Sequence, residues 1–167
     1  MNKRKLYSDG FTLVELLIVI VIIGVLAGIS VAAYSGVQKS ARDSTVQSDL
    51  SNAMKQLAMY EVENGKAPST SAELSTVNIK PTKSAYNSSR QNFYYCANIS
   101  DNKYAIGVAT KDNNYFIATS VDGIESVNSV TANETCQAIG LTNTDDTNAY
   151  PRIGYNNTTK VWETWIK

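Results

Sequence analysis

The chain begins with polar residues, continues with one long apolar run, and then alternates between apolar and polar positions. Leu16 to Ile29 is almost uninterrupted apolar sequence, and about twenty mostly apolar residues are enough to cross a bilayer as a helix. Between Phe11 and Gln38 the only ionisable side chains are Glu15 and Tyr34. We therefore expect this end of the chain in lipid and the rest in water.

Beyond the apolar run, the pattern predicts that the same helix continues as an amphipathic helix. Apolar side chains recur there at three- and four-residue spacings, namely Val46, Leu50, Ala53, Met54, Leu57 and Tyr60. Asn64-Gly65 indicates a left-handed stop, and Pro68 follows where a helix could not continue. From Phe11 to Asn64 the helix would be roughly 80 Å long. Half of it must therefore stand outside the bilayer.

The rest of the sequence predicts an α+β fold in which this helix packs against a small antiparallel sheet. A polar connecting loop, 69–91, contains a candidate short helix at Ser71 to Leu74. Runs of aromatic and β-branched residues predict strands at 92–97, 103–110, 115–120, 150–155 and 160–165, the last two forming a hairpin. A further short helix is expected within Val130 to Leu141. One sheet face should cover the helix stripe, because an isolated small sheet is unstable.

Composition excludes several classes of function. Lys plus Arg equals Asp plus Glu, 15 each, so no basic field is available to hold nucleic acid. The absence of histidine excludes Ser-His-Asp and Cys-His nucleophiles and His-containing zinc sites. We expect neither an enzyme nor a cofactor or metal. Five basic residues could form a local patch or scatter on folding, namely Lys80, Lys83, Arg90, Lys103 and Lys111.

Other polar and aromatic features have a structural interpretation beside a functional one. Two close acidic pairs, Glu61 with Glu63 and Asp145 with Asp146, could bind calcium through carboxylate oxygens, but their spacing matches no EF-hand and favours solvated charge. Four aromatic residues could form a contact surface or pack in the core, namely Tyr150, Tyr155, Trp162 and Trp165. Sequons such as Asn87 and Asn98 permit glycosylation in a host with the machinery.

Two cysteines, Cys96 and Cys136, follow the apolar segment, whereas the basic stretch 3–5 precedes it. The orientation rule places the N-terminus in the cytoplasm and the remainder outside. Outside, two thiols tend to pair, and a bridge closing such a loop is worth roughly 3 to 4 kcal/mol in the chain-entropy model. The alternative is a pair of free buried thiols.

The residues before the apolar run distinguish three kinds of N-terminus. Lys3-Arg4-Lys5 is followed by Ser8-Asp9-Gly10 and then Phe11 to Glu15. An ordinary secretory signal is cut after its apolar run, where Val31-Ala32-Ala33 would serve. Cleavage before the run and an uncleaved signal anchor are the alternatives.

Glu15 also has two interpretations. A carboxylate at this depth costs a few kcal/mol unless it is paired or lies at the interface. Thr12 and Glu15 match a capping box at the positive end of the helix dipole. Alternatively, cleavage after Gly10 would give Phe11 a positively charged amino terminus one turn from Glu15, in the same chain or in a neighbour.

The segment Gly10 to Ala27, GFTLVELLIVIVIIGVLA, resembles the leader junction and N-terminal helix of type IV prepilins and pseudopilins. The resemblance is specific because it sets a glycine, a phenylalanine, a threonine and a glutamate in register with a long apolar helix. It implies that a membrane peptidase cuts after Gly10 and N-methylates Phe11. It also implies that Glu15 neutralises the amino terminus of an adjacent subunit and sets axial register.

By this resemblance the chain would be a structural subunit of a type IV pilus or related filament, with a minor pilin or a pseudopilin of type II secretion or DNA uptake as the alternative. A membrane-anchored binding or adhesion module is the alternative from another class. Implied partners are other pilin subunits, prepilin peptidase, an assembly ATPase, membrane platform proteins and, before assembly, membrane lipid. The expected parts are a leader (1–10), a transmembrane and polymerisation helix (11–34), its amphipathic continuation (35–65) and an extracytoplasmic head (66–167).

The helix departs from the family at Ala32, where many members have a proline that helps to bend or melt it. Gly24, Gly28 and Ser30 are then the remaining weak points. Small residues recur at every fourth position of this helix, namely Gly24, Gly28, Ala32 and Gly36. A stripe of small residues allows two helices to approach closely. Glycine and alanine are, however, common in membrane helices in general.

Overall fold

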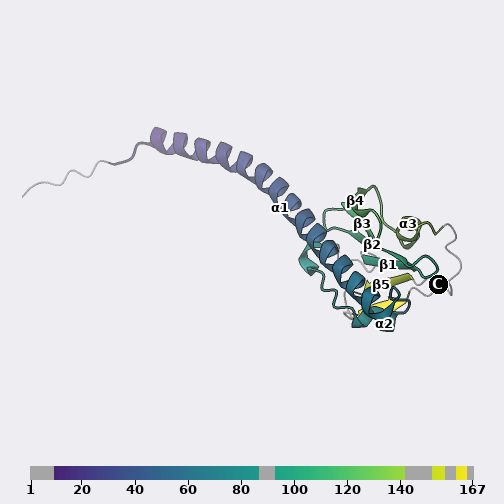
Figure 1. Cartoon of the computed structure of the whole chain (residues 1–167). Helices are drawn as coiled ribbons and strands as arrows, with labels where there is room; N and C mark the ends of the chain where they lie inside the picture. The colour runs from purple at the N-terminus through teal and green to yellow at the C-terminus, as the bar shows by residue number, and fades with distance from the viewer. Residues whose placement is uncertain (1–9, 87–92, 142–151, 157–160, 165–167) are drawn as a thin grey trace, which may run out of the picture. The chain divides into compact units, whose positions relative to one another are not determined.

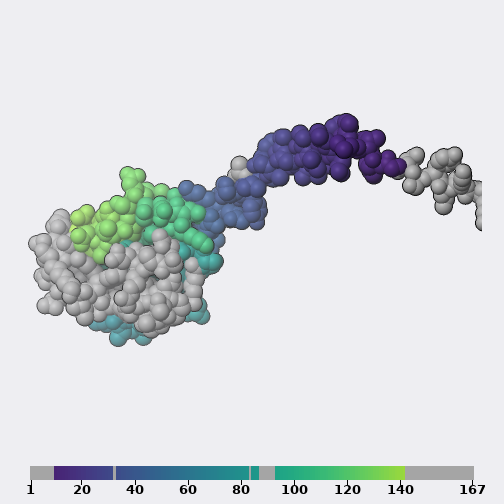
Figure 2. All heavy atoms as spheres, turned by 180° about the vertical axis from the view of Figure 1, so that it is seen from behind, coloured from purple at the N-terminus to yellow at the C-terminus, as the bar shows by residue number. Residues whose placement is uncertain are grey.

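A computed structural model describes residues 10–86, 93–141, 152–156 and 161–164, and its contacts divide the chain into two units, Met1–Lys39 and Ser40–Lys167. The long helix α1, Leu13–Asn64, belongs to both units. Within the described ranges it is the one helix long and apolar enough to cross a membrane. In the first unit its large apolar side chains are uncovered, and Figure 2 shows them in purple.

The second unit is the predicted α+β fold (Figure 1). Six strands form one antiparallel sheet in the order β4-β3-β2-β1-β5-β6. Their bounds are Phe93–Asn98 (β1), Lys103–Ala109 (β2), Tyr115–Thr119 (β3), Gly123–Val127 (β4), Arg152–Asn156 (β5) and Val161–Thr164 (β6). Two short helices, α2 (Ser71–Thr76) and α3 (Ala132–Gln137), and the 3₁₀ turn η1 (Lys83–Ala85) complete it.

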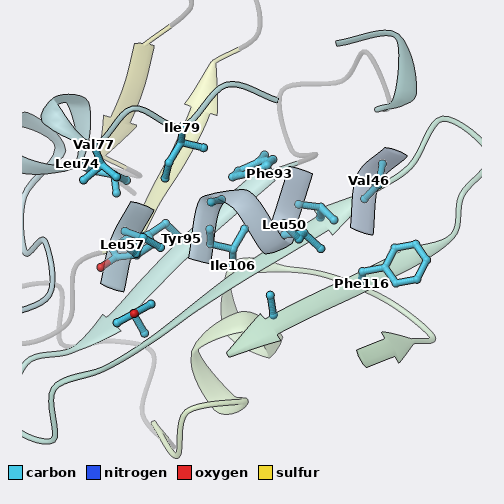
Figure 3. Packing of buried hydrophobic residues seen from close by; sticks show 14 of the residues in the cluster. Val46, Leu50, Leu57, Leu74, Val77, Ile79, Phe93, Tyr95, Ile106 and Phe116 are labelled. Carbon is cyan, nitrogen blue, oxygen red and sulfur yellow. The ribbon is translucent and has the colours of Figure 1, made fainter. Parts of the chain in front are cut away.

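The main core lies between α1 and one face of the sheet (Figure 3). The fully buried stripe Val46, Leu50 and Leu57 of α1 packs with strand residues such as Tyr95 and Ile106. Helix α2 closes this core with Leu74, and the segment after it adds Val77 and Ile79. Burial of a large apolar side chain contributes about 1.5 to 3 kcal/mol. The predicted cover of the helix stripe by the sheet is therefore confirmed.

A second cluster lies on the opposite face, under α3. Alternate residues of β1, Tyr94 and Cys96, point here, as the two-residue period of a strand requires. Cys96 and Cys136 form a disulfide that ties β1 to α3, so the predicted pairing is confirmed. Because both faces are covered, β1 is buried along its whole length.

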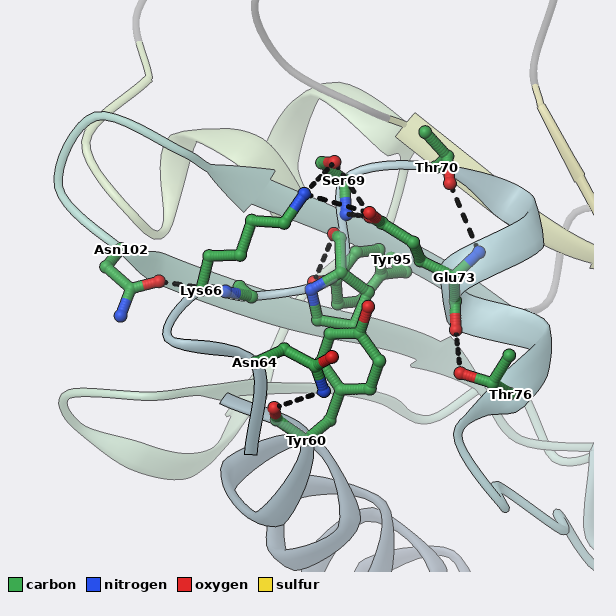
Figure 4. A network of polar contacts seen from close by, with 11 residues as sticks. Tyr60, Asn64, Lys66, Ser69, Thr70, Glu73, Thr76, Tyr95 and Asn102 are labelled. Atoms are coloured by element: carbon green, nitrogen blue, oxygen red, sulfur yellow. Dashed lines mark hydrogen bonds and ion pairs between the residues drawn. The ribbon is translucent and has the colours of Figure 1, made fainter. Parts of the chain in front are cut away.

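The end of α1 is fixed by a network of polar contacts (Figure 4). Gly65 has a φ of +71°, the left-handed conformation predicted for the stop. Beyond it, Lys66 Nζ lies 2.8 Å from Glu73 Oε1, while the Ser69 backbone N–H donates to Glu73 Oε2. The buried hydroxyl of Tyr95 donates to the Pro68 carbonyl at 3.0 Å. The chain thus leaves the helix along a defined path.

Candidate processing and assembly site

The residues ahead of α1 present an accessible junction. Gly10 and Phe11 precede the helix, and the Phe11 side chain is 88% exposed. An added Cβ at Gly10 would meet nothing within 4 Å. An exposed, non-helical peptide bond is the form that a peptidase can bind. The basic stretch 3–5, Ser8 and Asp9 lie outside the described residues.

Thr12 and Glu15 form the predicted capping box. Glu15 Oε2 accepts from the Thr12 backbone N–H at 2.8 Å and from Thr12 Oγ1 at 2.7 Å. In return, the Glu15 backbone N–H donates to Thr12 Oγ1 at 3.2 Å. These bonds satisfy donors that the first turn of a helix otherwise leaves without a partner.

Both bonds to the Glu15 carboxylate reach the same oxygen atom. Within the part of the chain that the structure describes, Oε1 accepts no hydrogen bond. A carboxylate has acceptor capacity on both oxygens. Glu15 can therefore keep its cap through Oε2 and accept from an ammonium group of a second chain through Oε1. The two interpretations of Glu15 are compatible at the same moment.

The apolar helix that follows is not buried by the other described parts of the chain. From Leu13 to Val31 its large apolar side chains are between 48% and 80% exposed. At Gly24, Gly28 and Gly36 an added Cβ would meet nothing within 4 Å, so each leaves an open place on the helix surface. The side chain of Ala32 is outside the description. A surface this apolar requires lipid or other helices around it.

Several functional assignments outside this segment find no support. Asn98 is 6% exposed and binds Asp101 through both ends of its amide, so this sequon is covered in the folded chain. Glu61 is not simply solvated, because it accepts from Asn102 Nδ2. No group of three metal-ligating side chains occurs among the described residues. Other candidates lie outside the described residues or side chains, namely Lys83, Asn87, Arg90, Asp145, Asp146, Tyr150, Tyr155, Trp162 and Trp165.

Sequence reasoning missed the role of the polar side chains that flank the α1 stripe. Asp49 accepts from the Thr82 backbone N–H at 2.7 Å and from the Tyr86 hydroxyl at 3.0 Å. Burial, together with this carboxylate, raises the pKa of Tyr86, so its hydroxyl keeps its proton and donates. Asp43 accepts from Asn114 Nδ2 at 2.6 Å. These acids hold loops against the helix, and their only sequence signal is their position beside the apolar stripe.

Comparison with known proteins agrees with this geometry. A family model described as the prokaryotic N-terminal methylation motif matches residues 6–31. The type IV wide pilus major component PilA4 of Thermus thermophilus is 39% identical over 75 residues, 45% of this chain and 57% of that protein. Type II secretion system core protein G of Aeromonas hydrophila is 37% identical over 82 residues, 49% of this chain and 56% of that protein. Its counterpart in Dickeya chrysanthemi is 40% identical over 82 residues, with 49% and 52% covered.

The motif places residues 6–31 with proteins that carry a prokaryotic N-terminal methylation segment, and the relatives are a type IV pilus component and core proteins of type II secretion systems. They confirm the predicted resemblance to the type IV pilin and pseudopilin family, which consists of structural subunits and not of enzymes. The chain spans little more than half the length of the curated relatives it matches.

Proposed function

We propose that the chain is a structural subunit of a type IV pilus or a related filament, cleaved after Gly10, methylated at Phe11 and assembled through α1. The observation that carries this proposal is the order of an exposed Gly10-Phe11 junction, a capped Glu15 and a long uncovered apolar helix. The junction fits processing, the carboxylate fits subunit register, and the helix fits burial in a filament.

Two successive environments account for the uncovered helix. Before assembly it spans the cytoplasmic membrane with the N-terminus in the cytoplasm, and lipid covers its apolar side chains. After extraction, the helices of other pilin subunits cover them in an extracellular filament. Gly24, Gly28, Ala32 and Gly36 would supply the close approach between helices. Processing and assembly would use prepilin peptidase, an assembly ATPase and membrane platform proteins.

The second candidate is a pseudopilin of a type II secretion or DNA-uptake system. It is favoured by the relatives named type II secretion system core protein G, which match about half of this chain. Both candidates require the same processing and the same helix, and they differ in the machine that the filament serves. Fibre formation after production with type IV pilus components or with type II secretion components distinguishes the two.

Mass spectrometry of the mature N-terminus tests the proposal directly. When the full chain is produced with a prepilin peptidase, we expect a protein that begins at Phe11 and carries one methyl group. An intact leader, or a start near Ala33, would contradict a prepilin. Gly10→Leu serves as the matched control, because it should block cleavage while leaving the helix in the membrane.

Glu15→Ala tests assembly separately from processing. We expect the variant to be cleaved and to remain in the membrane but to enter filaments several-fold less efficiently, because the charge that pairs with a neighbouring amino terminus is gone. Glu15→Gln keeps the size and loses the charge, so it should behave in the same way. Normal fibre yield from both variants would rule out a register role for Glu15.

A further inference from the structure

Glu15 and Tyr34 bound the stretch of apolar and small residues from Leu16 to Ala33, within the unit that ends at Lys39. Tyr34 follows Glu15 by 19 positions in the same helix. At about 1.5 Å per residue, the two lie roughly 28 Å apart along the axis. The hydrocarbon core of a bilayer is about 30 Å thick. When Glu15 is at one edge of this core, Tyr34 is therefore at the other.

The helix between these two residues has no other feature that fixes its depth. Its side chains are apolar or small, apart from Ser30. The Ser30 hydroxyl donates to the Leu26 carbonyl at 2.8 Å, so it needs no partner from the headgroup layer. The next charged residue beyond Tyr34 is Lys39, more than one turn further along.

The Tyr34 side chain is suited to the boundary between lipid and water. It is 65% exposed on α1, so its ring is available to the surroundings of the helix. A tyrosine ring has an apolar body and a polar tip, and such rings are enriched at the level of the headgroups. A second helix could also cover this ring, but the match between the spacing and the bilayer thickness favours lipid.

We infer that Tyr34 binds the phospholipid headgroup layer at the outer face of the cytoplasmic membrane and sets the depth of α1 before assembly. The inference rests on the proposed function, because it requires a membrane-anchored subunit. Tyr34 thereby holds Glu15 at the inner edge of the bilayer. There the carboxylate is positioned to meet the amino terminus of the next subunit.

Labelling of a single introduced cysteine measures this depth. Gly36→Cys, just outside Tyr34, is treated in spheroplasts with a membrane-impermeant maleimide, while Cys96 and Cys136 are held in their disulfide. In the Tyr34→Leu background the apolar run is extended, so we expect the helix to sink and the labelling rate to fall at least threefold. Tyr34→Trp should preserve the wild-type rate. Val31→Leu, one turn away, is the matched control and should also preserve it.

The outcomes separate this inference from the proposed function. If Tyr34→Leu stays in the membrane fraction and labels at the wild-type rate, the anchor is wrong even though the subunit is membrane-bound. If Tyr34→Leu labels at the wild-type rate and also gives fewer fibres, Tyr34 contacts neighbouring helices instead of lipid. If the unsubstituted chain is found in the soluble fraction, both proposals fail. The double variant Tyr34→Leu with Val37→Trp places the aromatic ring about one turn further along the helix. If the boundary between positions that the maleimide labels and positions that the membrane protects also shifts by one turn, the anchor is supported further.

Discussion

The guanidinium of Arg42 forms two hydrogen bonds to the carboxylate of Asp112, one of them 2.7 Å long, between Nη2 and Oδ1. The two residues are 70 positions apart in the chain. The pair fastens the β2–β3 turn to α1, and the adjacent Asp43–Asn114 bond holds the other end of the same turn. A two-point contact of this kind fixes direction as well as distance.

We predict that Arg42→Lys destabilises the head, because an ammonium group cannot reproduce the two parallel bonds of a guanidinium. The melting temperature of the full chain in detergent, followed by near-UV circular dichroism, should fall by a few degrees. Lys39→Arg is the matched control, because it exchanges the same two residue types, in the reverse direction, at a position outside the pair. Equal melting temperatures for Arg42→Lys and the unsubstituted chain would show that the pair contributes no stability.

Gly107→Ala tests how closely α3 approaches the sheet. A Cβ at this position of β2 would lie 2.2 Å from Thr135 Oγ1 and 2.8 Å from Val130 Cγ1. Both neighbours are buried, so α3 and the segment that leads into it must move away, at a cost of about 1 to 3 kcal/mol. We expect a lower free energy of unfolding in urea. Gly24→Ala, where an added Cβ meets nothing, should leave the unfolding of the head unchanged.

Much of this fold could be predicted from the sequence because its signals are local. The helix stop at Gly65 and strands β1 to β3 follow from turn residues and short apolar runs. Strand β4 was not predicted, because Gly123–Val127 is mostly exposed and carries Glu125 in its centre. Its structure depends on pairing with β3, which no local pattern encodes.

Polar contacts differ in the same way: those between residues close in the sequence could be predicted, and those between distant residues could not. Thr12 and Glu15 are three positions apart, so their capping box could be predicted from spacing alone. The pair Arg42 and Asp112 joins segments that only the fold brings together. Long-range polar pairs therefore escaped prediction although each residue is plainly visible in the sequence.

The contact between Lys66 and Glu73 predicts sensitivity to acid. The Lys66 ammonium, followed by the backbone N–H of Ser69, lowers the pKa of Glu73 from 4.5 to about 2. A lowered pKa in the folded state stabilises the protein above the unfolded pKa, and this contribution is lost as the pH falls from about 4.5 to about 2. Solvent screening limits it to about 1 kcal/mol.

Urea unfolding at pH 7, 4 and 2 checks this expectation. Glu73→Gln should be less stable than the unsubstituted chain at neutral pH, and the difference should shrink as the pH falls through this window. Glu63→Gln, the same exchange at an exposed position of α1, is the matched control. A constant difference at all three pH values would mean that Glu73 acts through packing and not through its charge.

Thr12 should matter for assembly because it holds Glu15 in one orientation. Thr12→Val removes Oγ1, and with it two of the three bonds of the capping box, while the backbone N–H still donates to Glu15. With only this bond left, the carboxylate is less well ordered and must be ordered further when it meets a neighbouring amino terminus, which opposes pairing. We expect fibre yield to fall several-fold in Thr12→Val, whereas Thr12→Ser keeps the hydroxyl and should assemble normally. Both variants should be cleaved and inserted as usual, as membrane fractionation and N-terminal mass spectrometry would report. If Thr12→Val and Thr12→Ser assemble equally well, Glu15 reaches its partner without help from the cap.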